Sequence, residues 1–538
     1  MKTLSLKHSS SFKLTKQLAS TLTIISIFLL MGANPSPDPD VELISVGTDG
    51  QAGTGASEIR AGAVSADGRY VVFSSLADNL TADDVSGWQV YLKDRETNTT
   101  ILVSDTGADT VYGSTMEGHA VISADGRYVA FSSTVGQLVA NDTNGSADIF
   151  VYDSSNKSIK RVSVASDGSE GSGCSCGWPD SCNGCEYHWV NSHPSISADG
   201  RYIAFTSFSD NLVNGDLPDT PDVFIHDQVN NTTTIVSRAS DGNLGNAGSG
   251  EAYISADGNY IAFSSRASNL VAEDWNNQQD VFLWQRTTGN LSRVSVASDG
   301  SEGNLTSTDP VISEDGKMVV FTSGATNLAS PDTNGAIYDI FLRDTQQNTT
   351  INLSSGLASG GARPAISSKG EYVAFTSGTD DIYLASLGSS QRQLIDDYMQ
   401  FSALNHNGDA LVMSGYASLL ANDTNTNKDV YLVKLDVQAP PVDPETCDDT
   451  IDNDGDGLID CDDWTDCNQA PACAEPEPPV DDGDNPAADD ATGTTTGGDD
   501  SGGSCAYASD GRFDPVLPIL IIAGLVYLGW RNSKKRSR

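Results

Sequence analysis

The sequence predicts an all-β fold, a seven-bladed β-propeller of four-stranded blades over residues 41–436. Three observations lead to this class. One phrase recurs at a nearly fixed period, each repeat contains four short strand-like segments, and the N-terminal segment has the pattern of the one strand that the last repeat lacks. Fixed-period repetition is typical of propellers and solenoids. An open β-solenoid is therefore the alternative to a closed ring.

The recurring phrase is Ser-x-Asp-Gly-x-Tyr-x-x-Phe, which first occurs within residues 64–75. Five further copies and one decayed copy follow, at residues 122–133, 196–207, 254–265, 312–323, 366–377 and 404–414. Asp-Gly forms tight turns because glycine adopts positive φ without strain, so each copy predicts two strands joined by a turn. Apolar residues fall on both faces of these strands, as expected for sheets packed between two neighbours.

The first segment of the predicted ring, residues 41–46, resembles the fourth strands expected at 161–164 and 293–296. The seventh repeat ends at its third strand, residues 429–434. We therefore expect the N-terminal strand to complete the seventh blade. Such pairing closes the ring and removes an exposed sheet edge.

The repeat phrase, followed by Asp-Ile-Phe-x-x-Asp at the third strand, resembles the TolB-type repeat. The same repeat builds the propeller domains of dipeptidyl-peptidase-like enzymes. The resemblance covers nearly all of residues 41–436 and implies the propeller fold. Family members include protein-binding scaffolds and enzyme gating domains, so the resemblance does not decide the function.

Residues 1–33 read as a secretory signal peptide. Four lysines precede the apolar stretch 18–30, and Ala33 stands at an acceptable cleavage site. An uncleaved anchor helix is the alternative, and both predict that the body of the protein is exported. Export permits disulfide bonds.

An acidic, cysteine-rich segment, residues 437–475, follows the predicted ring. Its twelve-residue loop places oxygen ligands at the spacing that Ca²⁺ requires, at Asp452, Asp454, Asp456, the Leu458 carbonyl, Asp460 and Asp463. Together with the flanking Cys447, Cys461, Cys467 and Cys473, the loop resembles the calcium-binding repeats of bacterial surface proteins and thrombospondin type 3 modules. Ca²⁺ is thus the predicted cofactor. The alternative is an acidic linker held by disulfides.

A second cysteine group, Cys174, Cys176, Cys182 and Cys185, lies in an insertion before the third repeat, near His188 and His193. Cys-x-Cys and Cys-x-x-Cys with nearby histidines can frame a zinc site. Disulfides are the preferred interpretation in an exported chain. Loops between second and third strands also repeat Asp-x-Asn, as at Asp142 and Asn144, and either bind cations or cap turns.

The C-terminal part contains a disordered acidic spacer, residues 476–504, and then a membrane segment, residues 505–538. Cys505, a Phe-Asp-Pro motif, an apolar run at 516–530 and a basic tail follow in order. This arrangement resembles the JDVT-CTERM type of C-terminal sorting signal, which implies that Cys505 is processed or modified. A plain single-span transmembrane anchor is the alternative. Either would hold the chain at the membrane with the ring outside.

Charge excludes one class of partner. The chain has 73 acidic and 30 basic residues, a formal net charge of −43, and such a field repels nucleic acid. We expect an exported protein of the cell envelope or surface that acts as a non-catalytic module binding a protein or glycan, and we assign no catalytic residue. The alternative is an extracellular glycan lyase or hydrolase that uses the scarce histidines for proton transfer: His119, His188, His193, His226 and His406.

Overall fold

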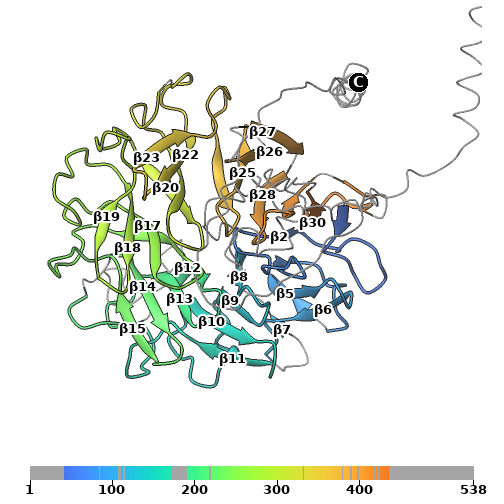
Figure 1. The fold of residues 1–538 in the computed structure, drawn as a ribbon. Coiled ribbons are helices and arrows are strands. Elements are labelled where there is room, and N and C mark those ends of the chain that lie inside the picture. The colour runs from blue at the N-terminus through green and yellow to red at the C-terminus, as the bar shows by residue number, and fades with distance from the viewer. Residues whose placement is uncertain are drawn as a thin grey trace, which may run out of the picture. The chain divides into compact units, whose positions relative to one another are not determined.

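The computed structural model describes residues 41–435 except 84, 107–110, 113–114, 173–190, 217–219, 331, 379, 388–390, 397–398, 417 and 421–422; the side chains of 111–119, 191 and 391 are also left undescribed. Seven antiparallel four-stranded sheets follow one another around a ring (Figure 1). The predicted all-β, seven-bladed propeller is confirmed. The only helix among the described residues is the short 3₁₀ helix η1 (Gly136–Leu138).

The strands of each blade are named from the innermost outward, and they follow chain order except that the N-terminal strand is the outermost of the seventh blade. The first three blades contain β2 (Ser57–Glu58), β3 (Tyr70–Ser75), β5 (Gln89–Asp94) and β6 (Thr99–Leu102); β8 (Thr115–Ile122), β9 (Tyr128–Ser133), β10 (Asp148–Asp153) and β11 (Ser158–Arg161); β12 (Asn191–Ile196), β13 (Tyr202–Ser207), β14 (Asp222–Asp227) and β15 (Thr232–Ile235). A small parallel pair, β4 (Val85–Ser86) and β7 (Val111–Tyr112), lies outside the blades.

The remaining four blades repeat this order. They contain β16 (Ser249–Ile254), β17 (Tyr260–Ser265), β18 (Asp280–Gln285) and β19 (Leu291–Arg293); β20 (Ser307–Ile312), β21 (Met318–Ser323), β22 (Asp339–Asp344) and β23 (Thr349–Asn352); β24 (Ala362–Ile366), β25 (Tyr372–Ser377), β26 (Asp381–Ser386) and β27 (Gln391–Asp396); β28 (Met399–Leu404), β29 (Ala410–Gly415), β30 (Asp429–Lys434) and β1 (Val41–Leu43).

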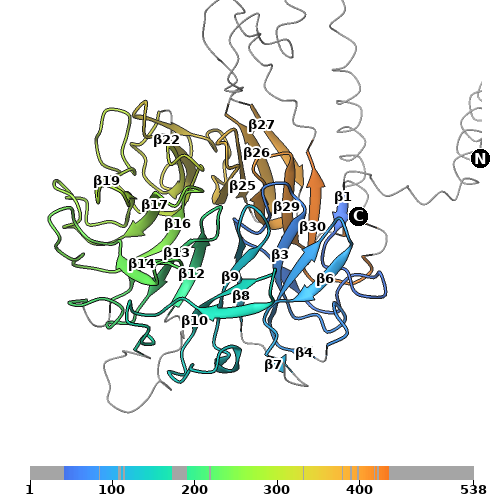
Figure 2. The ribbon, with the colours of Figure 1, turned by 60° about the horizontal axis from the view of Figure 1, so that its bottom comes forward.

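The ring is closed by the N-terminal strand, as the sequence predicts. β1 pairs antiparallel with β30, so the blue first strand of the described residues lies beside their orange last strand (Figure 2). Beyond β1, Ile44 N donates to the carbonyl oxygen of Val430 at 2.8 Å, and the Ser45 hydroxyl donates to Asp429 Oδ1 at 2.7 Å. The regular strand is shorter than the expected 41–46, but side-chain and backbone bonds continue the closure through Ser45.

The Asp-Gly turns of the repeat lock neighbouring blades together. The turn glycine of one blade lies against the tyrosine ring of the blade before it. At Gly200, where φ is +72°, an added Cβ would lie 2.7 Å from Tyr128 Cγ. The same pairing recurs at Gly126 and Tyr70, Gly258 and Tyr202, Gly316 and Tyr260, and Gly408 and Tyr372. The recurring glycine and tyrosine are thus explained by contact between repeats as well as by the turn.

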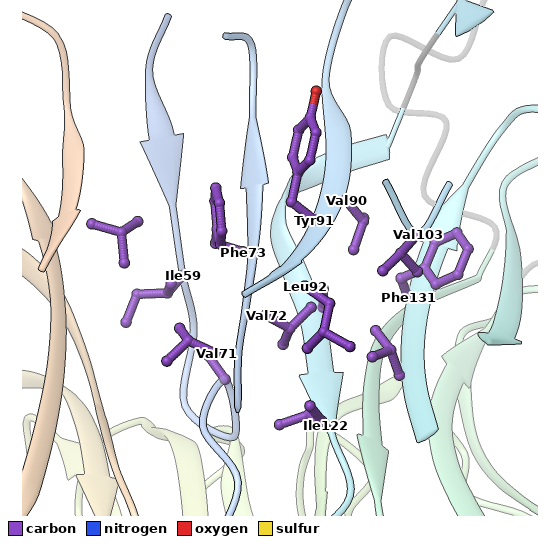
Figure 3. Close-up of a cluster of buried hydrophobic side chains, with 14 of the residues drawn as sticks. Ile59, Val71, Val72, Phe73, Val90, Tyr91, Leu92, Val103, Ile122 and Phe131 are labelled. Atoms are coloured by element: carbon purple, nitrogen blue, oxygen red, sulfur yellow. The ribbon is translucent and has the colours of Figure 1, made fainter. Parts of the chain in front are cut away.

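The core lies between the sheets, and both faces of the inner strands are buried. In β3, Val71, Val72 and Phe73 are each at most 1% exposed. Figure 3 shows how they and their neighbours fill the space between the first two blades. Aromatic pairs between the second and third strands recur around the ring, as in Phe73 with Tyr91, whose ring centroids are 5.7 Å apart. The predicted packing of each sheet between two others is confirmed.

Candidate functional site

The innermost strands of all seven blades line a channel along the ring axis, and the hollow at its narrower end has a volume of about 100 Å³. Here the second residue of the Ser-x-Asp-Gly turn joins the next blade through its backbone in the first three blades and in the fifth. Ala66 N donates to the Ala124 oxygen at 2.9 Å, Ala124 N to the Ala198 oxygen at 3.1 Å, and Ala198 N to the Ala256 oxygen at 2.9 Å. Farther round the same end, His406 Nδ1 lies 3.0 Å from Glu314 Oε2.

The opposite end of the channel is shaped by β-bulges. In β12, β16, β20 and β24 two residues oppose a single residue of the next strand. The first of the two lies three positions before the last apolar residue of its strand. These four residues all have positive φ: His193 (53°), Glu251 (54°), Asp309 (49°) and Arg363 (54°). Such conformations cost free energy in non-glycine residues and cluster at functional sites, and bulges redirect side chains.

The same position in the other three blades is Ala61, His119 and Phe401. Of the His119 side chain the structure gives no description. We call the seven residues at this position the bulge ring. Proline follows three of them, at Pro194, Pro310 and Pro364, and this fits a bulge because proline cannot donate to a strand ladder.

A cavity of about 140 Å³ lies inside the bulge ring. Its walls include Arg60, next to the ring residue Ala61, together with the ring residues of the third to seventh blades. Tyr253 and Val121 line both this cavity and the narrow half of the channel, so they form its floor. A larger hollow of about 670 Å³ lies near Lys93 and Tyr152, at the outer strands of the first two blades.

The positive wall of the cavity is built around an aromatic ring. The guanidinium carbons of Arg60 and Arg363 each lie 4.7 Å from the ring centroid of Phe401. A cation within about 6 Å of an aromatic face is attracted to it. Phe401 therefore holds two positive charges at the cavity wall.

The negative wall comes from the fourth and fifth blades. Glu251 Oε2 accepts a hydrogen bond from the Asp309 backbone N–H at 3.1 Å and another from the Ser264 hydroxyl at 2.7 Å. The Asp309 side chain is exposed to the channel, as is that of Arg363 on the next blade. Among the described residues neither side chain forms an ion pair within 4.0 Å, so the two opposite charges are held apart.

The pKa values of two ring residues are shifted. Protein around the Asp309 carboxyl reduces its hydration, and with the nearby charge of Glu251 this raises the pKa to about 6, although Arg60 and Arg363 act in the opposite direction. Reduced hydration lowers the pKa of His193 to about 4. At pH 7, His193 is neutral and Asp309 is largely ionised. Perturbed pKa values that cluster in a cavity are typical of functional sites.

The histidines that the sequence offers for proton transfer have different positions. His193 belongs to the bulge ring, and His406 lies at the narrow end. His226 lies in β14, the third strand of its blade; it is buried, and its Nδ1 is 3.0 Å from the Thr233 hydroxyl oxygen. Residue 188 lies outside the described residues. The structure therefore brings one of these histidines into the charged cavity and separates His226 and His406 from it.

The other predicted sites lie outside the described residues. These are the calcium ligands Asp452, Asp454, Asp456, Leu458, Asp460 and Asp463, the two cysteine groups, and Ala33 and Cys505. They stay predictions. Within the described part of the chain, no group of three or more His, Cys, Asp or Glu residues is arranged to hold a metal ion. No helix in that part is long and apolar enough to cross a membrane.

The Asp-x-Asn loops of two blades enclose an arginine. Arg161 Nη1 lies 3.2 Å from Asp142, 3.3 Å from Asp148 and 3.0 Å from Glu170. Arg293 occupies the corresponding position beside Asp274, Asp280 and Glu302. The asparagine caps the loop, since Asn144 Oδ1 accepts from the Ser146 N–H at 2.8 Å. In these two blades the turn-capping interpretation is confirmed, and a guanidinium supplies the positive charge.

No protein-family model matches the sequence, and no curated protein matches it. Similar solved structures include an oligogalacturonate lyase in complex with manganese (13% identity, 71% of this chain and 90% of that chain, TM-score 0.46). Others are an oligogalacturonate lyase from Vibrio parahaemolyticus (10%, 73% and 96%, TM-score 0.46) and TolB from Acinetobacter baumannii (15%, 69% and 81%, TM-score 0.35). At these identities and TM-scores the similarities support no conclusion about ligand, metal or activity in this chain.

Proposed function

We propose that this protein is an exported, membrane- or surface-anchored binding module whose propeller binds a ligand at the bulge ring without converting it. The observation that carries the proposal is the set of charged side chains projected at one level of the channel from strained backbone positions. Strain of this kind is retained where function requires a particular side-chain direction. A channel mouth with a few convergent polar groups over an apolar floor is a favourable place for recognition.

The test is a binding screen with the full-length mature chain against glycan and peptide libraries. Arg363→Gln removes one charge of the bulge ring, and Glu314→Gln removes a charge from the narrow end of the same channel. We expect a ligand that binds the wild type and Glu314→Gln but not Arg363→Gln. A ligand whose binding is unaffected by Arg363→Gln would overturn the assignment of the site.

The same binding mixtures test the proposal that the ligand is not converted. Bound ligands are recovered and weighed by mass spectrometry, and unchanged masses are expected. One observation favours the enzyme alternative, namely that His193 and Asp309, two side chains able to transfer protons, line the same cavity. Products that disappear in His193→Ala would establish a lyase or hydrolase and refute a purely binding role.

The proposal also includes a calcium-binding stalk and a C-terminal membrane segment, on the sequence patterns around residues 447–473 and 505–538. The stalk would present the ring at a distance from the membrane, since an acidic spacer stays extended by self-repulsion. Mass spectrometry of both ends of the native protein tests the export and processing steps. A mature chain that starts near residue 34 is expected, and recovery of the unprocessed chain from the cytoplasm would exclude export.

A further inference from the structure

The bulge ring holds a positive and a negative side chain apart, and a ligand group that carries both charges could lie between them. Arg363 is held against Phe401 on the sixth blade, with its guanidinium carbon 4.7 Å from the ring centroid. Asp309 is held on the fifth blade, where its backbone N–H donates to Glu251 at 3.1 Å. Both side chains are exposed to the channel and no ion pair joins them at 4.0 Å or less. Each charge is thus available on its inner side to a bound group.

The size and net charge of the cavity limit the class of ligand that fits it. A volume of about 140 Å³ is below the roughly 300–1,000 Å³ of sites for drug-sized ligands, so it accommodates a small molecule or one end of a larger one. Arg60 and Arg363 balance Glu251 and Asp309, while the whole chain carries −43. A net anion would be repelled by that overall field, whereas a neutral group with both charges would not.

Building on the proposed binding function, we infer that the bulge ring recognises a compact zwitterion, an ammonium and a carboxylate on the same carbon. The carboxylate lies against Arg363 on the side of Phe401, and the ammonium lies against Asp309 and Glu251. Arginine presents paired N–H donors that match a carboxylate, and an ammonium donates to carboxylate oxygens. A free α-amino acid and an amino acid attached through its side chain to a larger ligand share this chemistry.

The experiment is calorimetric titration of the full-length mature chain with the common free L-amino acids and with Nε-acetyl-lysine, which carries the group on an amide-linked stem. We expect either a free amino acid or Nε-acetyl-lysine to bind. The compound that binds identifies whether the ligand is a free amino acid or one attached through its side chain. The N-acetyl and the amide derivatives of the bound compound, which lack the ammonium and the carboxylate charge respectively, should each bind at least tenfold more weakly.

Variants assign each charge to its partner. Arg363→Gln should weaken the parent compound at least tenfold but leave the affinity of its amide nearly unchanged, because the amide no longer has the carboxylate. Asp309→Asn should likewise weaken the parent compound at least tenfold but leave the affinity of its N-acetyl derivative nearly unchanged, because that derivative lacks the ammonium. Glu314→Gln, at the narrow end, should bind as the wild type does. Circular dichroism of each variant confirms that the fold is retained.

Two results would overturn the inference. One is that no zwitterion of either source binds; the other is that the N-acetyl or amide derivative binds as tightly as the parent. If a different ligand from the library screen is lost with Arg363→Gln, the proposed binding function holds and the zwitterion is refuted. If a ligand is instead converted to product, the non-catalytic proposal is the one that fails.

Discussion

Replacing Gly200 by alanine tests the contact that joins successive blades. The residue has φ +72°, and a side chain in this region costs about 1–2 kcal/mol in an L-residue. The new Cβ would also lie 2.7 Å from Tyr128 Cγ, so the tyrosine ring or the backbone must move. Overpacking of this kind costs about 1–3 kcal/mol. The expected loss is therefore about 2–5 kcal/mol, a large part of the stability of a typical domain.

A matched glycine separates the two contributions. Gly168 has φ +85° and no atom within 4 Å of an added Cβ, so Gly168→Ala should lose only the conformational part, about 1–2 kcal/mol. Urea unfolding followed by circular dichroism measures the midpoint of each variant. Tyr128→Ala with Gly200→Ala should lose less than the sum of the single variants, because the overlap is relieved. Equal losses for Gly200→Ala and Gly168→Ala would refute the interlock between blades.

Three further predictions concern other parts of the chain. Burial raises the pKa of Asp429 to about 6. Asp429 therefore holds a proton more tightly in the folded protein than in the unfolded chain, so the free energy of unfolding should fall as pH rises from about 4 through 6. This group contributes at most about 3 kcal/mol to that fall. Asp429→Asn should flatten that part of the stability–pH curve, and an unchanged slope would contradict the assignment. Ca²⁺ should protect residues 447–473 from proteolysis, and protection that persists after alanine replacement of Asp452, Asp454 and Asp456 would exclude the calcium loop. Alkylation under denaturing, non-reducing conditions should leave Cys174, Cys176, Cys182 and Cys185 unmodified if they form disulfides, whereas modification of all four after chelation would indicate zinc.

The fold could be predicted from the sequence because most blades contain the same determinants. The Asp-Gly turn, the tyrosine and the phenylalanine recur, and each has a structural partner in its own blade or the next. The closing strand could be predicted as well, since residues 41–46 match the fourth strand of other repeats. Its regular pairing nevertheless ends at Leu43, because Ser45 bonds to Asp429 through its side chain.

The bulge ring could not be predicted in the same way, because it occupies the position at which the repeats differ. Glu251, Asp309 and Arg363 are charged residues of both signs, and neither charge nor periodicity distinguishes them from ordinary surface positions. One signal was available, since Pro194, Pro310 and Pro364 interrupt what otherwise read as innermost strands. The most conspicuous sequence features, the cysteine groups and the acidic loop, lie outside the described residues.

The closing of the seventh blade also determines how the protein responds to a pulling force. The chain leaves the ring from β30, which is hydrogen-bonded to β29 on one side and to β1 on the other. Tension applied at Leu435 therefore loads two ladders at once, and β30 cannot leave its sheet without breaking both. Because β1 carries the opposite end of the described chain, a load at one of these ends is shared with the other, so the seventh blade is reinforced against extraction of β30.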